Sequence, residues 1–66
     1  MKATVNGEVH DLPDGCTIGA LLQTLGTSHT GIAVARNERV VPRRQHDACT
    51  ISDGDHIEII RAVAGG

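Results

Sequence analysis

The chain has 66 residues, no aromatic side chain and a net charge of −2. We expect residues 1–66 to form one domain, and a domain this small buries only about 60% of the surface that its unfolded chain exposes. So small a core rarely supports a preorganised pocket, which argues against a conventional enzyme. The acidic charge and the missing aromatic rings argue against nucleic-acid binding, which relies on basic side chains and base stacking.

The sequence has no features of an exported or membrane-bound protein. Residues 1–5 resemble neither a signal peptide nor a lipidation site, and no apolar run approaches the roughly 18 residues of a membrane span. Cys16 and Cys49 are too few for a disulfide scaffold or a four-thiolate metal site, and we expect both to be small, buried or half-buried residues. The four histidines show no metal-binding spacing. We therefore predict a cytoplasmic protein with no metal and no membrane contact.

The N-terminal part predicts a β-hairpin. Polar and apolar residues alternate in residues 2–5, and residues 8–12 return as a second strand. Asn6-Gly7 between them is the strongest short hairpin signal, because both residues tolerate a positive φ. Residues 13–15, Pro-Asp-Gly, then form a turn.

A short helix follows this turn. Thr17 is placed to cap it, and Gly26 lies where a left-handed residue commonly ends a helix. Between them, apolar residues recur at the helical spacing i, i+3, i+4 and i+7: Ile18, Leu21, Leu22 and Leu25. A helix of about two turns is unstable alone, so we expect it to pack against a sheet.

The second half predicts three more strands. Residues 32–35 form a continuous apolar run, which is typical of a strand buried in mid-sheet. A turn at 37–38 leads to a short strand at 39–41, which Pro42 ends because it cannot donate to a ladder. Residues 43–50 lack periodicity and are expected to be irregular and partly exposed. Residues 56–61 form the last strand.

The resulting order is β-β-α-β-β-β, an α+β fold with a mixed sheet of about five strands on one short helix. Placing the last strand beside the first, and parallel to it, buries both in the middle of the sheet. That arrangement is the ubiquitin-like β-grasp.

The C-terminal tail, residues 62–66, is the most informative segment. Its residues are Ala, Val, Ala, Gly and Gly, with no proline, no charge and no large side chain. Five extended residues reach roughly 17 Å, and glycine adds no side-chain bulk. We predict a flexible Gly-Gly tail that threads a narrow channel and places the Gly66 carboxylate in another protein's active site, with Gly65 providing access. Two terminal glycines also occur by chance, so their position after the last β-grasp strand is what favours this function.

Several segments together match one known pattern: Asn6-Gly7, Thr17-Ile18 with Leu21-Leu22, residues 33–37, Val40-Val41-Pro42-Arg43 and, most strongly, residues 53–66. In these segments, and over essentially its whole length, the chain resembles the sulfur carrier proteins of thiamine biosynthesis, a ubiquitin-like family. These proteins often carry an aromatic residue soon after the Pro42-Arg43 pair, where His46 is nearest in this chain.

The resemblance implies a sulfur-transfer cycle centred on Gly66. A ubiquitin-activating-like adenylyltransferase uses ATP and magnesium to adenylate the terminal carboxylate. Sulfur derived from cysteine through a desulfurase displaces AMP and leaves a thiocarboxylate, and thiazole synthase takes that sulfur into the thiazole ring. This chain would bind no cofactor itself and would act as a protein co-substrate, not as an enzyme.

The resemblance also implies docking contacts with these partners. The sheet face that the helix leaves uncovered is the expected docking surface. Arg61 is the charge best placed to guide the tail, while Arg43-Arg44 fits either a solvated surface or a partner contact.

Other functions remain open at this point. A carrier for another pathway, such as the small subunit of molybdopterin synthase, would use the same tail chemistry with a different acceptor. A ubiquitin-like modifier would join Gly66 to lysines of other proteins. A plain interaction module would have a tail without function.

Overall fold

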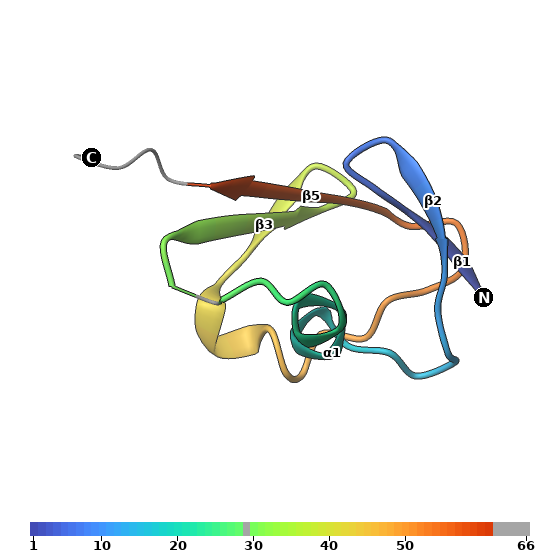
Figure 1. Cartoon of the computed structure of the whole chain (residues 1–66), viewed down its shortest axis with the longest axis horizontal. Coiled ribbons are helices and arrows are strands. Elements are labelled where there is room, and N and C mark those ends of the chain that lie inside the picture. Colours follow the sequence, from blue (N-terminus) through green and yellow to red (C-terminus); the bar gives the residue numbers. More distant parts are fainter. Residues whose placement is uncertain (29, 62–66) are drawn as a thin grey trace.

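The computed structural model describes residues 1–28 and 30–61, and it shows a five-stranded sheet with one helix packed on one face (Figure 1). None of the helices in these residues is long and apolar enough to cross a membrane. The strand order is β2-β1-β5-β3-β4. In chain order the elements are β1 (Lys2–Val5), β2 (Glu8–Asp11), α1 (Ile18–Thr24), β3 (Ile32–Arg36), β4 (Arg39–Val41), the 3₁₀ turn η1 (Arg43–Gln45) and β5 (His56–Arg61).

Both hairpins are closed by two-residue turns with left-handed backbones. Asn6 and Gly7 have φ values of 50° and 84°, and Asn37 and Glu38 have values of 50° and 70°. Two consecutive positive φ values match the twist of the flanking strands, and Asn and Gly adopt them at low cost. The predicted turns at 6–7 and 37–38 are confirmed.

The last strand lies at the centre of the sheet, as predicted. β5 pairs in parallel with β1 through Thr4–His56 and Val5–Ile57, and antiparallel with β3 along its other edge. The expectation that residues 32–35 are buried in mid-sheet is only partly right. β3 is an inner strand and Val34 is buried, but Ala33 is exposed because the helix covers only one face of the sheet.

Helix α1 begins and ends as the sequence predicts. The Thr17 hydroxyl accepts a hydrogen bond from Ala20 N over 3.1 Å, which satisfies one free donor of the first turn. At the other end Gly26 has φ 69° and donates to Gln23 O, while Thr27 N donates to Leu22 O. This pair of bonds is a Schellman motif, which needs a left-handed residue and therefore favours glycine.

The core lies between α1 and the inner face of the sheet. Because the chain has no aromatic residue, branched aliphatic side chains supply most of the buried area. The buried core cluster consists of Ala3, Val5, Leu12, Cys16, Ile18, Leu21, Leu22, Val34, Ile51 and Ile57.

The segment 43–50 is more ordered than the sequence predicts. It opens with the turn η1, and Thr50 then forms a β-bridge with Thr17. His46 is only 2% exposed, and its Nε2 lies 3.2 Å from the carbonyl oxygen of Val41. The expectation of an irregular, partly exposed stretch is therefore wrong at His46, which takes a core position beneath the sheet although histidine is less often fully buried than the aliphatic residues.

Candidate functional site

Strand β5 carries the predicted tail and anchors it to the centre of the fold. Arg61 is the last residue of the strand and the last that the structure describes, and Figure 1 shows β5 ending well beyond the β1–β2 hairpin. Gly65 and Gly66 lie outside the described residues, so their role in the tail stays a prediction. The described part of the site is consequently the strand that holds the tail and the sheet face around it.

The first hairpin holds β5 through an asparagine side chain. Asn6 Oδ1 accepts a hydrogen bond from Ile59 N over 2.8 Å, and Asn6 Nδ2 lies 3.4 Å from Ile59 O. The backbone N–H of Asn6 donates to Ile57 O over 2.9 Å. The sequence indicated Asn6 only as a turn residue, and its second role depends on which strand lies beside the turn.

A second asparagine holds the beginning of β5 from the other side. Asn37 Oδ1 accepts from His56 N over 2.9 Å, and Asn37 N donates to His56 O over 2.8 Å. The Asn37 side-chain amide also donates to Asp55 Oδ1 over 3.0 Å. The two turn asparagines therefore hold the first four residues of β5 from its two edges.

Asp55 is the best-connected charged group of the described chain. Its carboxylate accepts hydrogen bonds from Arg36 Nε, Asn37 Nδ2 and Ser52 N, at 2.6, 3.0 and 2.8 Å. Burial by itself raises the pKa of Asp55, but these three donors together outweigh burial and hold its pKa below the ordinary value. The charged Asp55 side chain thus links the β3–β4 hairpin to the start of β5 through hydrogen bonds.

The sheet face opposite α1 carries exposed apolar side chains. Val9, Val40 and Ile60 are 68%, 73% and 55% exposed. Residues directly opposite each other in neighbouring strands share a face. The register places Val40 beside Ala35 and Ile60 beside Ala33, and it also places the exposed Glu58 beside Ala35. The four apolar residues therefore form a surface over β3, β4 and β5 that includes one carboxylate. We call it the outer apolar surface.

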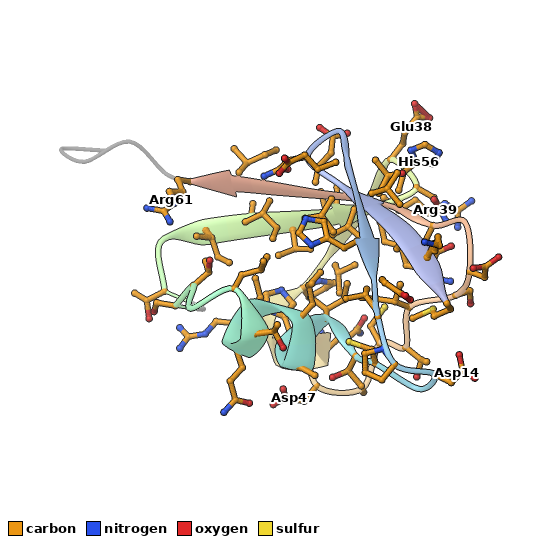
Figure 2. The ribbon with its side chains drawn as sticks, turned by 45° about the vertical axis from the view of Figure 1, so that its right-hand side comes forward. Asp14, Glu38, Arg39, Asp47, His56 and Arg61 are labelled. Atoms are coloured by element: carbon orange, nitrogen blue, oxygen red, sulfur yellow. The ribbon has the colours of Figure 1, made fainter. Side chains whose placement is uncertain are left out.

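Polar residues lie beside one end of this surface, and Arg61 lies at the far end of β5 with its side chain on the opposite face, which it shares with Ile57 and Ile59. Figure 2 shows Glu38, Arg39 and His56 close to the β3–β4 turn, whereas Arg61 lies at the far end of β5. No carboxylate of the described chain is within ion-pair distance of Arg61, which is exposed. Its charge is therefore available to a partner, in agreement with the predicted guiding role but without testing it.

The remaining polar candidates form no centre for chemistry. Cys16 is buried and Cys49 is half-buried, as predicted, and both are free thiols. Within residues 1–28 and 30–61, no three His, Cys, Asp or Glu side chains gather as metal ligands. Arg43 and Arg44 are exposed beside Asp47 in a shallow hollow on the helix side of the molecule. The described residues thus hold the start of the tail and expose the outer apolar surface.

The sequence model of the ThiS family matches residues 3–66, nearly the whole chain. This chain belongs to the ThiS family. Among full-length relatives, the sulfur carrier protein ThiS of Escherichia coli is 33% identical over 66 residues, with both chains covered completely. The crystal structure of the ThiS protein of Geobacter metallireducens has a TM-score of 0.85, 30% sequence identity and complete coverage of both chains.

ThiS family membership confirms the ubiquitin-like fold and the sulfur-carrier function in thiamine biosynthesis that the sequence predicted. A further relative, the thiazole synthase of Paramagnetospirillum magneticum, is 36% identical over 66 residues. This chain spans only 20% of the length of that protein. The match therefore does not assign the synthase activity to this chain.

Proposed function

We propose that this ThiS-family chain carries sulfur on its own C-terminus, as a thiocarboxylate at Gly66. The observation that carries the proposal is the position of β5, the central strand, which is bonded on both edges and leads directly into residues 62–66. A central strand gives the tail a fixed origin, because moving it would break ladders on both sides. The small residues that follow give it access to a narrow channel.

The chemistry explains why such a carrier needs partners. A carboxylate is a poor electrophile, so its oxygen must first attack the α-phosphate of ATP, which releases pyrophosphate and forms an acyl adenylate. Sulfide then attacks the carbonyl carbon of Gly66, AMP leaves and a thiocarboxylate remains. Where the nucleophile is a persulfide, the acyl disulfide that forms is cleaved by a thiol, which leaves as a mixed disulfide with the former persulfide carrier. The described residues of this chain include no assembled group for either step, so both steps fall to an adenylating enzyme that brings ATP and magnesium.

Thiazole synthase is the acceptor that we propose for the sulfur. Segments matching this whole chain occur within two proteins named thiazole synthase, from Paramagnetospirillum magneticum and Magnetococcus marinus. A carrier domain on the same chain as a synthase would act at high effective concentration, which supports a direct transfer between the two. We propose a desulfurase that takes sulfur from cysteine as the ultimate donor, and the cytoplasm as the compartment.

The outer apolar surface is the proposed docking face for these partners. Val40 and Ile60 are more than half exposed on a sheet that no described element covers on this side. Exposed apolar residues that gather around a functional end of a small protein are typical of interaction sites. On β5 this face ends at Ile60, next to Arg61 in the chain, so a partner seated there also lies close to the origin of the tail.

Intact-mass spectrometry tests the proposal directly. The chain is incubated with the adenylating enzyme of its source organism, ATP, magnesium, a desulfurase and cysteine. We expect its mass to rise by the difference between one sulfur and one oxygen atom. A chain lacking Gly66 serves as the control and should keep its mass. An unchanged mass of the complete chain, with an enzyme that activates another carrier in the same assay, would refute the proposal. High-mass adducts on lysines would indicate a protein modifier instead.

A further inference from the structure

Strand β5 extends beyond the strand that pairs with one of its edges. The parallel ladder between β1 and β5 contains only Thr4–His56 and Val5–Ile57. The next pair in register would be Asn6–Glu58, in which Asn6 O would accept from Ile59 N, but the chain turns away there because Asn6 and Gly7 adopt positive φ values. Figure 1 shows the β1–β2 hairpin beside the first part of β5 only.

The Asn6 side chain replaces the missing step of this ladder. In a continued parallel ladder, Ile59 N–H and C=O would bond to the backbone of the neighbouring strand. Here Asn6 Oδ1 accepts from Ile59 N, and Asn6 Nδ2 approaches Ile59 O. The amide of a side chain thus imitates a peptide group and satisfies one more residue of β5 before the hairpin ends.

Arg61 is the next residue whose backbone faces this edge. Backbone groups alternate between the two edges along a strand, and Ile57 and Ile59 both bond toward β1 and its turn. The N–H and C=O of Arg61 consequently point to the same side, where no described residue bonds to them. The other edge is closed, because β3 pairs with β5 as far as Ile32–Arg61.

We propose that the edge of β5 at Arg61 is a strand-addition site, at which an extended segment of the adenylating enzyme pairs with this chain. The inference rests on the proposed function, since it names how the enzyme grips the origin of the tail. Backbone pairing at an open edge is a common way to bind an extended segment. The added segment would lie beside the Asn6 amide and continue the sheet where the hairpin leaves it.

Two neighbouring features favour an enzyme segment with an acidic side chain. The Arg61 guanidinium is exposed and has no ion-pair partner among the described residues. The Ile60 side chain, 55% exposed, lies on the outer apolar surface next to this edge. A segment with a carboxylate opposite Arg61 and an apolar residue against Ile60 would complement both. Because the open edge is short, pairing there would set the register and direction of the enzyme segment and contribute little to the overall binding affinity.

Amide-to-ester substitution removes one backbone donor and keeps every side chain. Cys49 makes this feasible, because a thioester of residues 1–48 ligates to a synthetic peptide of residues 49–66 at the native cysteine. The test protein carries the ester between Ile60 and Arg61. The control carries it between Ser52 and Asp53, where the lost Asp53 N–H has no hydrogen-bond partner in the described structure. Each ester also weakens the carbonyl acceptor of the preceding residue. In the control this is Ser52 O, which accepts from Asp55 N, and in the test protein it is Ile60 O, which faces β3, so the two proteins are matched in this respect.

The measured quantity is the KM of each protein in ATP–pyrophosphate exchange by the adenylating enzyme. We expect the Arg61 ester to raise KM roughly three- to tenfold, as for the loss of one hydrogen bond. The Asp53 ester should match the all-amide semisynthetic protein. Equal KM values for the two esters would overturn the proposal. If the all-amide protein itself were never activated, the proposed function would fail instead.

Hydrogen exchange gives a readout that a purely structural role of Arg61 would not change. The Arg61 amide should exchange rapidly in the free chain, because it lacks a partner among the described residues. On addition of the adenylating enzyme it should become protected, while the amide of Asp53 should not. Unchanged exchange at Arg61 in an enzyme complex shown to have formed would also overturn the proposal.

Discussion

Arg36 Nε donates a hydrogen bond to Asp55 Oδ2 over 2.6 Å, and this ion pair joins β3 to the segment that leads into β5. The Asp55 side chain is 9% exposed, whereas that of Arg36 is 33% exposed. The pair is therefore half-sheltered from solvent, and its stabilising effect lies between those of surface and buried ion pairs.

Replacing Asp55 should make the protein less stable and less sensitive to acid. Asp55→Asn places an amide among three donors, so we expect a loss of about 1–3 kcal/mol in unfolding free energy at pH 7. The folded pKa of Asp55 lies below its unfolded value, so the carboxylate stabilises the fold above the unfolded pKa. That contribution is lost as the pH falls through the folded pKa.

Urea unfolding followed by far-UV circular dichroism between neutral and strongly acidic pH measures this effect. The two stability curves should converge as the pH falls, because wild-type Asp55 is then protonated as well. Glu38→Gln, at an exposed turn residue, is the control and should run parallel to wild type. A constant gap between Asp55→Asn and wild type down to the lowest pH would contradict the assignment.

The buried histidine should matter far more to stability than the exposed one. His46→Ala removes a side chain that is 2% exposed and leaves a cavity beneath the sheet, so we expect a loss of about 2–4 kcal/mol. His56→Ala, on the exposed face of β5, should change stability by less than about 0.5 kcal/mol. Thermal melting of both variants compares them, and similar melting temperatures would show that His46 is not a core residue.

A charge on the outer apolar surface should weaken partner binding without unfolding the chain. Val40→Asp places a carboxylate at a residue that is 73% exposed, so folding stability should hardly change. Burying that carboxylate against a partner would carry a desolvation penalty, and we expect at least a tenfold rise in the KM of the adenylating enzyme. Thr24→Asp adds the same charge on α1, on the other side of the molecule, and should leave KM unchanged. Equal effects of both variants would point to net charge instead of docking.

Adding bulk to the tail should block activation while the fold stays intact. Gly65→Val introduces a β-branched side chain next to the reacting carboxylate, and its restricted backbone opposes threading. We expect at least a hundredfold loss in adenylation rate with an unchanged urea midpoint. Val63→Ala, which reduces bulk in the same tail, is the matched control. Adenylation of Gly65→Val at the wild-type rate would show that access through a narrow channel is not the constraint.

The elements with local signals were predictable to within a residue or two. Asn6-Gly7 needs only its own two backbones to form a turn, and Thr17 and Gly26 cap α1 through bonds inside one or two helical turns. The alternation of polar and apolar residues located β5, because this signal too lies within the segment itself. The parallel placement of β5 beside β1 followed from burial, since both strands need neighbours on two edges.

The wrong or missing expectations all concern contacts between distant segments. His46 has no local signal for burial, because its core position depends on α1 and β4 meeting around it. Asp55 and Asn37 come close only after β3 and β5 pair, and their hydrogen bonds join residues 18 apart in sequence. Ala33 looked buried because an apolar run cannot show that the helix covers one face alone.

The amino-acid sequence by itself determined the β-grasp, the capped helix and the small-residue tail at 62–66, because each depends on local propensity or on spacing along the chain. Only the tertiary structure decided which groups hold that tail's origin in place. The Asn6 side chain completes the ladder at Ile59 and leaves the backbone of Arg61 open, and this follows from where one strand ends beside another. No pattern within a single segment encodes that relationship, since it is made by two strands more than fifty residues apart.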